Sequence, residues 1–166
     1  MRLSENDFLD LLKEHQNIIH KICRIYTYDD ASQKDLFQEI SIQLWKSYPS
    51  FEGKSKFTTW MYRVGLNTAI TLYRKNKKTI LGEDLAMLPE LKAYEEYDDT
   101  KEIQIRWLYE KIETFSEIEK ALILLYLEDK KYTEIAETLG ISEVNARVKI
   151  SRLKRKLKNN AEVIQL

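Results

Sequence analysis

Apolar residues recur at helical spacing along most of this chain. Between residues 6 and 28 they return every three or four positions, which predicts one long helix with a single buried face. Patterns of the same period cover residues 35–48, 57–77 and 100–114. No stretch alternates apolar and polar residues clearly, and breakers are few, with only four Gly and two Pro. We therefore expect an all-α fold.

The second of these predicted helices carries a wide apolar stripe. Ser32, with Asp35 three residues on, forms a capping pattern that is expected to open the helix, and Pro49 is expected to end it. Core packing is the main role expected for the tryptophan in this stripe. The stripe consists of Leu36, Phe37, Ile40, Leu44, Trp45 and Tyr48.

A second hydrophobic centre lies in the C-terminal half of the chain. Ser116 and Glu119 form a capping box directly before the segment ALILLYL, residues 121–127, which is the most hydrophobic of the chain. We expect this helix to form the core of a small second domain. The same run is far too short to cross a bilayer.

Residues 132–157 have the pattern of a helix-turn-helix. A short amphipathic segment ends at Gly140, a residue type that suits the left-handed conformation at a helix C-terminus. Ile141 can fill the gap between the two helices, and Ser142 is a good N-cap for the second. Apolar residues then recur on one face of the second helix, at Ala146, Ile150, Leu153 and Leu157. Such a motif can place side chains in the major groove of DNA.

The remaining faces of that second helix are cationic. Between Val144 and Asn160 there is no acidic residue, whereas lysine and arginine are frequent. A cationic face alone is often only a solvated surface. Because the glycine turn, the N-cap and the apolar period all agree with a helix-turn-helix, the pattern favours DNA binding.

The net charge of zero, from 27 basic and 27 acidic residues, hides a strong partition along the chain. Residues 54–78 contain basic but no acidic side chains, whereas the charged side chains of residues 79–102 are mostly acidic. Phosphate groups respond to local charge within a Debye length of roughly 8 Å. We therefore expect one DNA-contacting domain over residues 1–78, an acidic linker over 79–102, and a helix-turn-helix domain over 103–166.

Candidate catalytic and metal-binding residues are scarce. Cys23 is the only cysteine, so no internal disulfide can form, and a small buried side chain in a reducing cytoplasm is the expectation. His15 and His20 lack the spacing and partners of a metal site. The sequence also contains no apolar signal segment, no phosphate-binding glycine loop and no nucleophile–base pattern. We expect a cytoplasmic, non-enzymatic protein with no cofactor, no metal and no membrane insertion.

Three segments of the chain resemble one protein family. The sigma-70 family has regions 2.1 to 2.4 that look like DLFQEISIQLW, residues 35–45, and FEGKSKFTTWMYRVGLNTAITLYRKNKK, residues 51–78. Region 4 of the same family resembles residues 115–158, FSEIEKALILLYLEDKKYTEIAETLGISEVNARVKISRLKRKLK. The nearest match is the small extracytoplasmic-function (ECF) group of bacterial sigma factors. The resemblance implies two small helical domains, sigma region 2 and sigma region 4, in the family's order.

The resemblance also implies a polymerase-binding surface. In the family, the segment that matches residues 35–45 docks on the clamp coiled coil of core RNA polymerase. Polar Gln and Glu side chains beside apolar ones can form an interface centre with a charged rim. The matching residues here are Asp35, Leu36, Gln38, Glu39 and Ile42, and Trp45 lies in the same segment although core packing is its main expected role.

Residues 51–56 and the start of the following helix match the family's element that captures a base flipped from the −10 region. Asn67 carries an amide donor and acceptor that suit an extruded base edge, and the cations suit phosphates. For Phe57 and Trp60, support of the loop is expected more than stacking on bases. The predicted −10 set is Phe51, Lys54, Lys56, Phe57, Trp60, Arg63, Asn67, Arg74 and Lys75.

The second helix of region 4 binds the −35 element in the family. Arg or Lys can pair with guanine O6 and N7, and Asn with adenine. The family commonly has a Gly-Thr pair and then Ser where this chain has Val144, Asn145 and Val148. Val148 is able either to touch a thymine methyl or to pack inward. The predicted −35 set is Asn145, Arg147, Val148, Lys149, Ser151, Arg152 and Arg155.

The partners implied by the resemblance are core RNA polymerase, through its clamp coiled coil and flap, and promoter DNA. An anti-sigma factor is a further candidate partner, because many relatives are held inactive by one. A stand-alone helix-turn-helix transcriptional regulator is the main alternative. A sigma-like adaptor that has lost promoter opening is another, although the basic and aromatic set within residues 54–78 argues against it.

Overall fold

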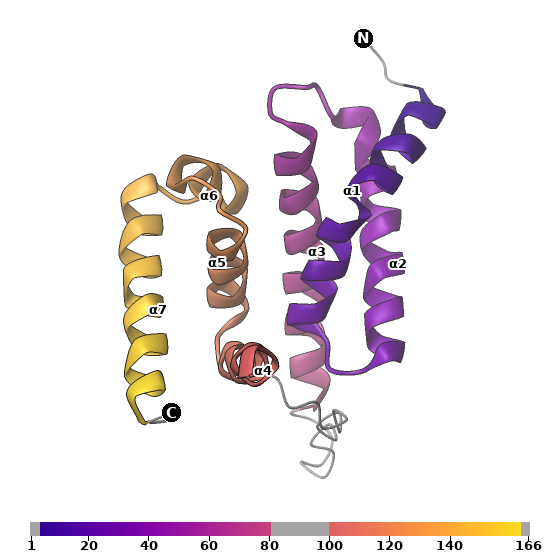
Figure 1. The fold of residues 1–166 in the computed structure, drawn as a ribbon. Coiled ribbons are helices and arrows are strands. Elements are labelled where there is room, and N and C mark those ends of the chain that lie inside the picture. The colour runs from indigo at the N-terminus through magenta and orange to yellow at the C-terminus, as the bar shows by residue number, and fades with distance from the viewer. Residues whose placement is uncertain (1–3, 81–99, 164–166) are drawn as a thin grey trace. The chain divides into compact units, whose positions relative to one another are not determined.

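The structure is a computed structural model that describes residues 4–80 and 100–163 (Figure 1). Within those two ranges every regular element is a helix, and the chain divides into two compact units, Met1–Tyr94 and Glu95–Leu166. The expected all-α fold is therefore confirmed. Most of the predicted acidic linker, namely residues 81–99, lies outside the described residues.

The first unit is a bundle of three long helices (Figure 1). It contains α1 (Glu5–Tyr26), α2 (Asp30–Ser47), the short 3-10 helix η1 (Tyr48–Ser50) and α3 (Phe57–Ile80). The three α-helices pack against one another through side chains with almost no exposure. These include Phe8, Ile19, Ile22, Ile40, Leu44, Met61 and Leu66.

Local hydrogen bonds explain where these helices begin. At the start of α1, Ser4 and Asp7 form a capping box. The cap of α2 is Asp29, whose Oδ1 accepts a hydrogen bond from the backbone N–H of Ser32 at 2.8 Å. The prediction that Ser32 opens this helix was wrong. An aspartate in extended conformation three residues earlier satisfies the free N–H group first.

The helix α3 approaches its neighbours closely at one glycine. A Cβ atom at Gly65 would lie 2.7 Å from Cδ1 of Ile22 and 3.5 Å from Cγ2 of Ile40. Both isoleucines are fully buried, so neither side chain has open space into which to move. The glycine therefore sets the spacing at which α3 packs on α1 and α2.

We expect Gly65→Val to destabilise the first unit by about 2 kcal/mol, because it overpacks a filled core. Gly65→Ala should cost less, since the gain in helix propensity of about 1 kcal/mol partly offsets the clash. The measurement is urea unfolding followed by circular dichroism. Asn76→Val, which places a β-branched side chain at an exposed position of the same helix, is the matched control and should change stability little.

The second unit contains α4 (Thr100–Glu113), α5 (Glu117–Leu127), α6 (Tyr132–Leu139) and α7 (Glu143–Val163). Helices α5, α6 and α7 pack together, and the predicted capping box of Ser116 and Glu119 opens α5. The expectation that residues 121–127 supply the core of this unit is confirmed for residues 121–125, which are buried.

The core of the second unit also contains a charged side chain that the sequence pattern did not reveal. Lys120 in α5 has 0% of its surface exposed. Nearby, burial raises the pKa of Glu113 at the end of α4, while the positive charge of Lys120 acts to lower it. A buried charge needs compensation, and the carboxylate of Glu113 is one negative group that acts on Lys120.

Two further expectations concern the chemistry of the chain. Cys23 is buried, as expected, and its burial raises the pKa of the thiol to about 12. The thiol therefore stays protonated at neutral pH and has little reactivity. Among the residues that the structure describes, no helix has the length and apolar character needed to span a membrane.

Candidate nucleic-acid interface

Helices α6 and α7 form the predicted helix-turn-helix. Gly140 adopts φ +66°, the left-handed conformation that ends α6, and the N–H of Ile141 donates to the carbonyl of Ala136. The Oγ of Ser142 accepts from the N–H of Asn145 at 3.1 Å, which confirms it as the N-cap of α7. The turn thus fixes the direction in which α7 leaves α6.

Helix α7 presents one apolar and one polar side. Ala146, Ile150 and Leu153 are buried against the rest of the unit. All seven residues of the predicted −35 set lie on the other sides of the helix and retain solvent exposure. Val148 is 43% exposed, so it does not pack inward and remains available to a DNA base. The predicted set is therefore accessible as a group.

Several cations of α7 contact side chains of the same unit. Arg147 pairs with Glu143 at 2.7 Å, and its guanidinium lies 4.5 Å from the centre of the Tyr132 ring. Lys154 lies 5.0 Å from the Tyr126 ring, and a hydrogen bond with Tyr126 raises its pKa. Lys154, which is not in the predicted −35 set, thus connects α7 to α5.

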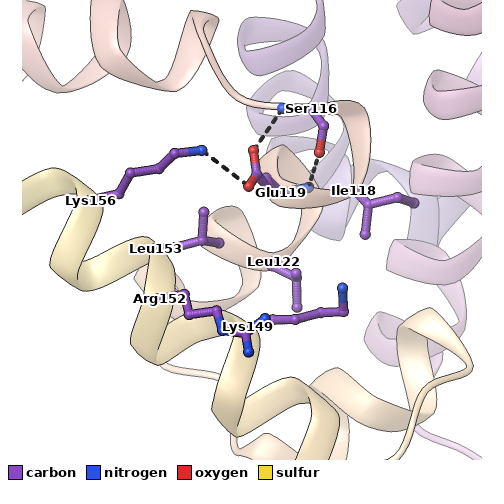
Figure 2. Close-up of a pocket in the computed structure, with 8 residues that line it drawn as sticks. All are labelled: Ser116, Ile118, Glu119, Leu122, Lys149, Arg152, Leu153 and Lys156. Carbon is purple, nitrogen blue, oxygen red and sulfur yellow. Dashed lines mark hydrogen bonds and ion pairs between the residues drawn. The ribbon is translucent and has the colours of Figure 1, made fainter.

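A groove of about 380 Å³ runs between α5 and α7 (Figure 2). Ile118, Leu122 and Leu153 contribute its apolar lining, and Lys149 and Arg152 line it from α7. Near one end, Lys156 pairs with Glu119 at 3.3 Å, the same glutamate that caps the Ser116 N–H. Two cations of the predicted −35 set, Lys149 and Arg152, therefore line this groove. The lining residues are Ser116, Ile118, Glu119, Leu122, Lys149, Arg152, Leu153 and Lys156.

In the first unit, an aromatic cluster supports the loop of residues 51–56. The Phe51 ring lies 5.0 Å from the Trp60 ring and 5.8 Å from the Phe57 ring, between centroids. Trp60 is only 8% exposed, a position that favours the expected support of the loop over a contact with −10 DNA. Its ring packs under the loop instead. Phe51 and Phe57 are half-buried and keep one part of each ring accessible.

The polar residues of the predicted −10 set lie on the outside of the first unit. Arg63, Asn67 and Arg74 follow one another at i, i+4 and i+11, which places them along one face of α3. Lys54 and Lys56 are exposed in the loop, where Lys54 pairs with Glu52. Asn67, Arg74 and Lys75 are exposed as well. The loop and this face of α3 thus carry the candidate contacts for a nucleic acid.

The predicted polymerase-binding residues occupy α2, with one exception. Asp35 and Gln38 are exposed, and Ile42 is 39% exposed. Leu36 is only 6% exposed, so its assignment to the contact surface was wrong. This leucine instead packs in the bundle core. Glu39 is half-buried and accepts a hydrogen bond from Gln43 at 2.9 Å.

Trp45 lies in the segment expected to dock on the polymerase, but its main expected role was core packing. It was expected in the core, yet it is 42% exposed and contacts the Phe8 ring edge-on at 5.3 Å. With Asp35, Gln38 and Ile42 it recurs at i, i+3, i+7 and i+10, which is one face of a helix. That spacing was readable in the sequence. We call Asp35, Gln38, Ile42 and Trp45 the outer α2 face.

Comparisons with known proteins match each of the two units to a region of one family. Family models for Sigma-70 region 2 and for Sigma-70, region 4 match residues 11–79 and 105–157. The ECF RNA polymerase sigma factor SigM of Bacillus subtilis (strain 168) is 25% identical over 153 residues, which is 90% of this chain and 91% of that protein. The ECF RNA polymerase sigma-E factor of Haemophilus influenzae is 29% identical over 148 residues, 77% of this chain and 74% of that protein.

Solved structures share the fold at low sequence identity. The sigma factor RpoE from Bartonella quintana, in a co-crystal structure with the anti-sigma factor NepR, superposes with a TM-score of 0.78 at 17% identity, covering 96% of this chain and 99% of that one. CnrH, in complex with the cytosolic domain of CnrY, gives a TM-score of 0.71 at 16% identity, covering 98% of this chain and 92% of that one.

A helical region 2 unit followed by a region 4 helix-turn-helix defines the class of the protein, and the chain belongs to the sigma-70 family. Within that family it is an ECF RNA polymerase sigma factor, as are the relatives that it matches over most of its length. It therefore acts in promoter-specific initiation of transcription.

Proposed function

We propose that three surfaces of this sigma factor bind the core polymerase, the −10 element and the −35 element, respectively. The outer α2 face, with Glu39 beside it, binds the clamp coiled coil of core RNA polymerase. The loop of residues 51–56 and the outer face of α3 open the −10 element and hold it. The exposed side of α7 binds the −35 element. The observation that carries the proposal is the exposure of these polar and cationic residues on two separate helical units.

The −10 contacts in this proposal are made by a reduced set. Asn67 reads an extruded base, while Arg63, Arg74 and Lys75 hold phosphates, together with the lysines of the loop. Phe51 and Phe57 offer partly accessible rings for stacking, and Trp60 supports them from below. Flipping a base out of a duplex costs a few kcal/mol, which such contacts offset.

The proposal assigns no chemistry of its own to the chain. RNA synthesis belongs to the core polymerase, and this subunit contributes binding and strand opening without catalysis, cofactor or metal. The acidic segment of residues 79–102 connects the two promoter-binding domains, 1–78 and 103–166, and region 4 contacts the polymerase flap. The place of action is the cytoplasm, where the polymerase and the genome are.

We also propose an anti-sigma factor as a regulatory partner. The support is that the RpoE structure with the same fold was solved in complex with the anti-sigma factor NepR. Pull-down of the tagged chain from cells grown without stress, followed by mass spectrometry, tests this idea. Recovery of core polymerase alone, under all growth conditions, would count against such a partner.

Reconstitution with core polymerase tests the main proposal. Purified chain and core enzyme are mixed with genomic fragments, and run-off transcripts are mapped. We expect new start sites preceded by a shared pair of −35 and −10 sequences. Transcription no higher than with core enzyme alone would overturn the proposal. Tight binding of one operator by the free chain in a gel shift, without polymerase, would instead favour a stand-alone regulator.

A further inference from the structure

Arg147 of α7 is held on two sides by residues of the helix-turn-helix. Its Nε and Nη2 donate hydrogen bonds to the same oxygen of Glu143, Oε1, at 3.2 and 2.7 Å. On its other side the guanidinium carbon lies 4.5 Å from the centre of the Tyr132 ring. Glu143 is one turn earlier on α7, and Tyr132 opens α6. The two helices of the motif therefore fix one side chain jointly.

We infer that Glu143 and Tyr132 are positioning residues that hold Arg147 for reading a guanine in the −35 element. The inference rests on the proposed role of α7 in −35 binding. Arginine has five N–H donors in a planar fork. Two of them are used by Glu143, so three remain for the base. A fork already fixed in direction loses less freedom on pairing with guanine O6 and N7 than a mobile one.

The carboxylate of Glu143 has a cost as well as a benefit for DNA binding. It stands in the first turn of the helix that faces DNA, and it repels phosphates. It also compensates part of the charge of Arg147. The Glu143–Arg147 pair therefore lowers the affinity for DNA of any sequence while it raises the discrimination between bases. Its removal should therefore shift non-specific affinity and specificity in opposite directions, which a purely structural residue does not do.

Glu143 is not needed to start α7, which separates its role from capping. The N-cap is Ser142, whose side chain accepts the N–H of Asn145. Helix α7 is also anchored by three buried apolar residues, Ala146, Ile150 and Leu153. Replacing Glu143 with glutamine keeps the length of the side chain but turns the charge-assisted pair with Arg147 into a weaker neutral hydrogen bond. The Glu143→Gln variant should accordingly fold as the wild type does.

The Tyr132 ring is the second support. Cation–π contact depends on the ring face and not on the hydroxyl group. Tyr132→Phe should therefore keep the positioning, whereas Tyr132→Leu should lose it. If the ring is what matters, Tyr132→Phe should behave like the wild type. If the hydroxyl group mattered, Tyr132→Phe should fail as Tyr132→Leu does.

The test measures base discrimination by the complete holoenzyme. Core polymerase with each variant binds promoter fragments that carry all four bases at each −35 position in turn, and dissociation constants are compared. We expect Arg147→Ala to lose guanine preference at one position. Glu143→Gln and Tyr132→Leu should lower discrimination about tenfold at that same position. Glu143→Gln should also bind unrelated DNA more tightly and with a steeper salt dependence.

Two comparisons decide the outcome. Glu119→Gln breaks a second acid–cation pair of α7, with Lys156, yet glutamine still completes the capping box of α5. This control should leave discrimination unchanged at every −35 position. In an Arg147→Ala background, Glu143→Gln should have no further effect on discrimination.

An equal loss of discrimination from Glu143→Gln with and without Arg147 would overturn the positioning role, since it would mean that Glu143 acts on DNA directly. An unchanged base profile for Glu143→Gln would overturn it too. If Arg147→Ala itself changes no base preference while the wild type still selects −35 sequences, the failure lies in the reading role assigned to Arg147. If the wild type selects no −35 sequence, the proposed function of α7 fails.

Discussion

Replacing Trp45 with glutamate is expected to weaken binding of the chain to core RNA polymerase by about a hundredfold, the scale of a tryptophan hot spot of 2–4 kcal/mol. Trp45 is 42% exposed at the end of the outer α2 face, next to Ile42, which is 39% exposed. Large apolar side chains that stay exposed beside acidic and amide groups are typical of an interface centre with a polar rim. Fluorescence anisotropy of the labelled chain, titrated with core enzyme without DNA, measures the effect.

The design separates a lost interface from a damaged fold. Trp45 also contacts Phe8 edge-on, so each variant needs a circular dichroism melt beside the binding assay. Trp45→Phe keeps an aromatic ring at both contacts and should lose much less affinity. Val144→Glu makes a similar change at an exposed apolar residue of α7 and should leave core binding unchanged. An affinity for core enzyme that is the same for Trp45→Glu and wild type would remove this residue from the interface.

Much of the fold was predictable because its signals are local. Helical periodicity, the capping box at Ser116, and the turn at Gly140 and Ser142 each depend on residues a few positions apart. The structure therefore bears out the helix-turn-helix and the long helices to within a few residues. The cap of α2 was misassigned to Ser32 because several residues near a helix start are able to cap, and Asp29 is the one in extended conformation.

The errors at the candidate sites have a different cause. A wide apolar stripe does not tell which edge faces the core. On α2, Leu36, Ile40 and Leu44 form the buried line at four-residue spacing, and Trp45 lies one position beyond it. For Trp60 the sequence left both a DNA contact and support of the loop open, and the aromatic cluster beneath the loop encloses it. Both placements depend on packing between helices, which the sequence alone does not determine.

Contacts between helices of the second unit could not be predicted from the sequence either. The pattern identified Arg147 as a candidate reader, but the Tyr132 ring comes from the preceding helix and meets it only in the fold. Lys120 was hidden for a related reason. Helix α5 is buried on nearly every side, so a lysine on it has no exposed face to occupy.

Replacing Asn67 with alanine is expected to lower the amount of open promoter complex about tenfold or more, because a bidentate amide–base contact is worth about 1–3 kcal/mol. Asn67 is exposed on the face of α3 that also carries Arg63 and Arg74. The contact forms only once a base has left the duplex, so the loss falls on the opening step. Binding to core enzyme should stay unchanged, since the outer α2 face is not altered. Permanganate reactivity of −10 thymines measures the melted fraction.

The same helix supplies a matched control. Asn76 is also exposed and lies about two and a half turns further along α3, hence on the opposite side from Asn67. Asn76→Ala makes the same chemical change and should leave melting at the wild-type level. Lys75→Ala should differ from both, because a lost phosphate contact weakens binding to every promoter and reduces the salt dependence. Permanganate footprints that are equal for Asn67→Ala and wild type would exclude base reading by Asn67. In that case the opening step would have to depend on the loop of residues 51–56 and the accessible parts of Phe51 and Phe57.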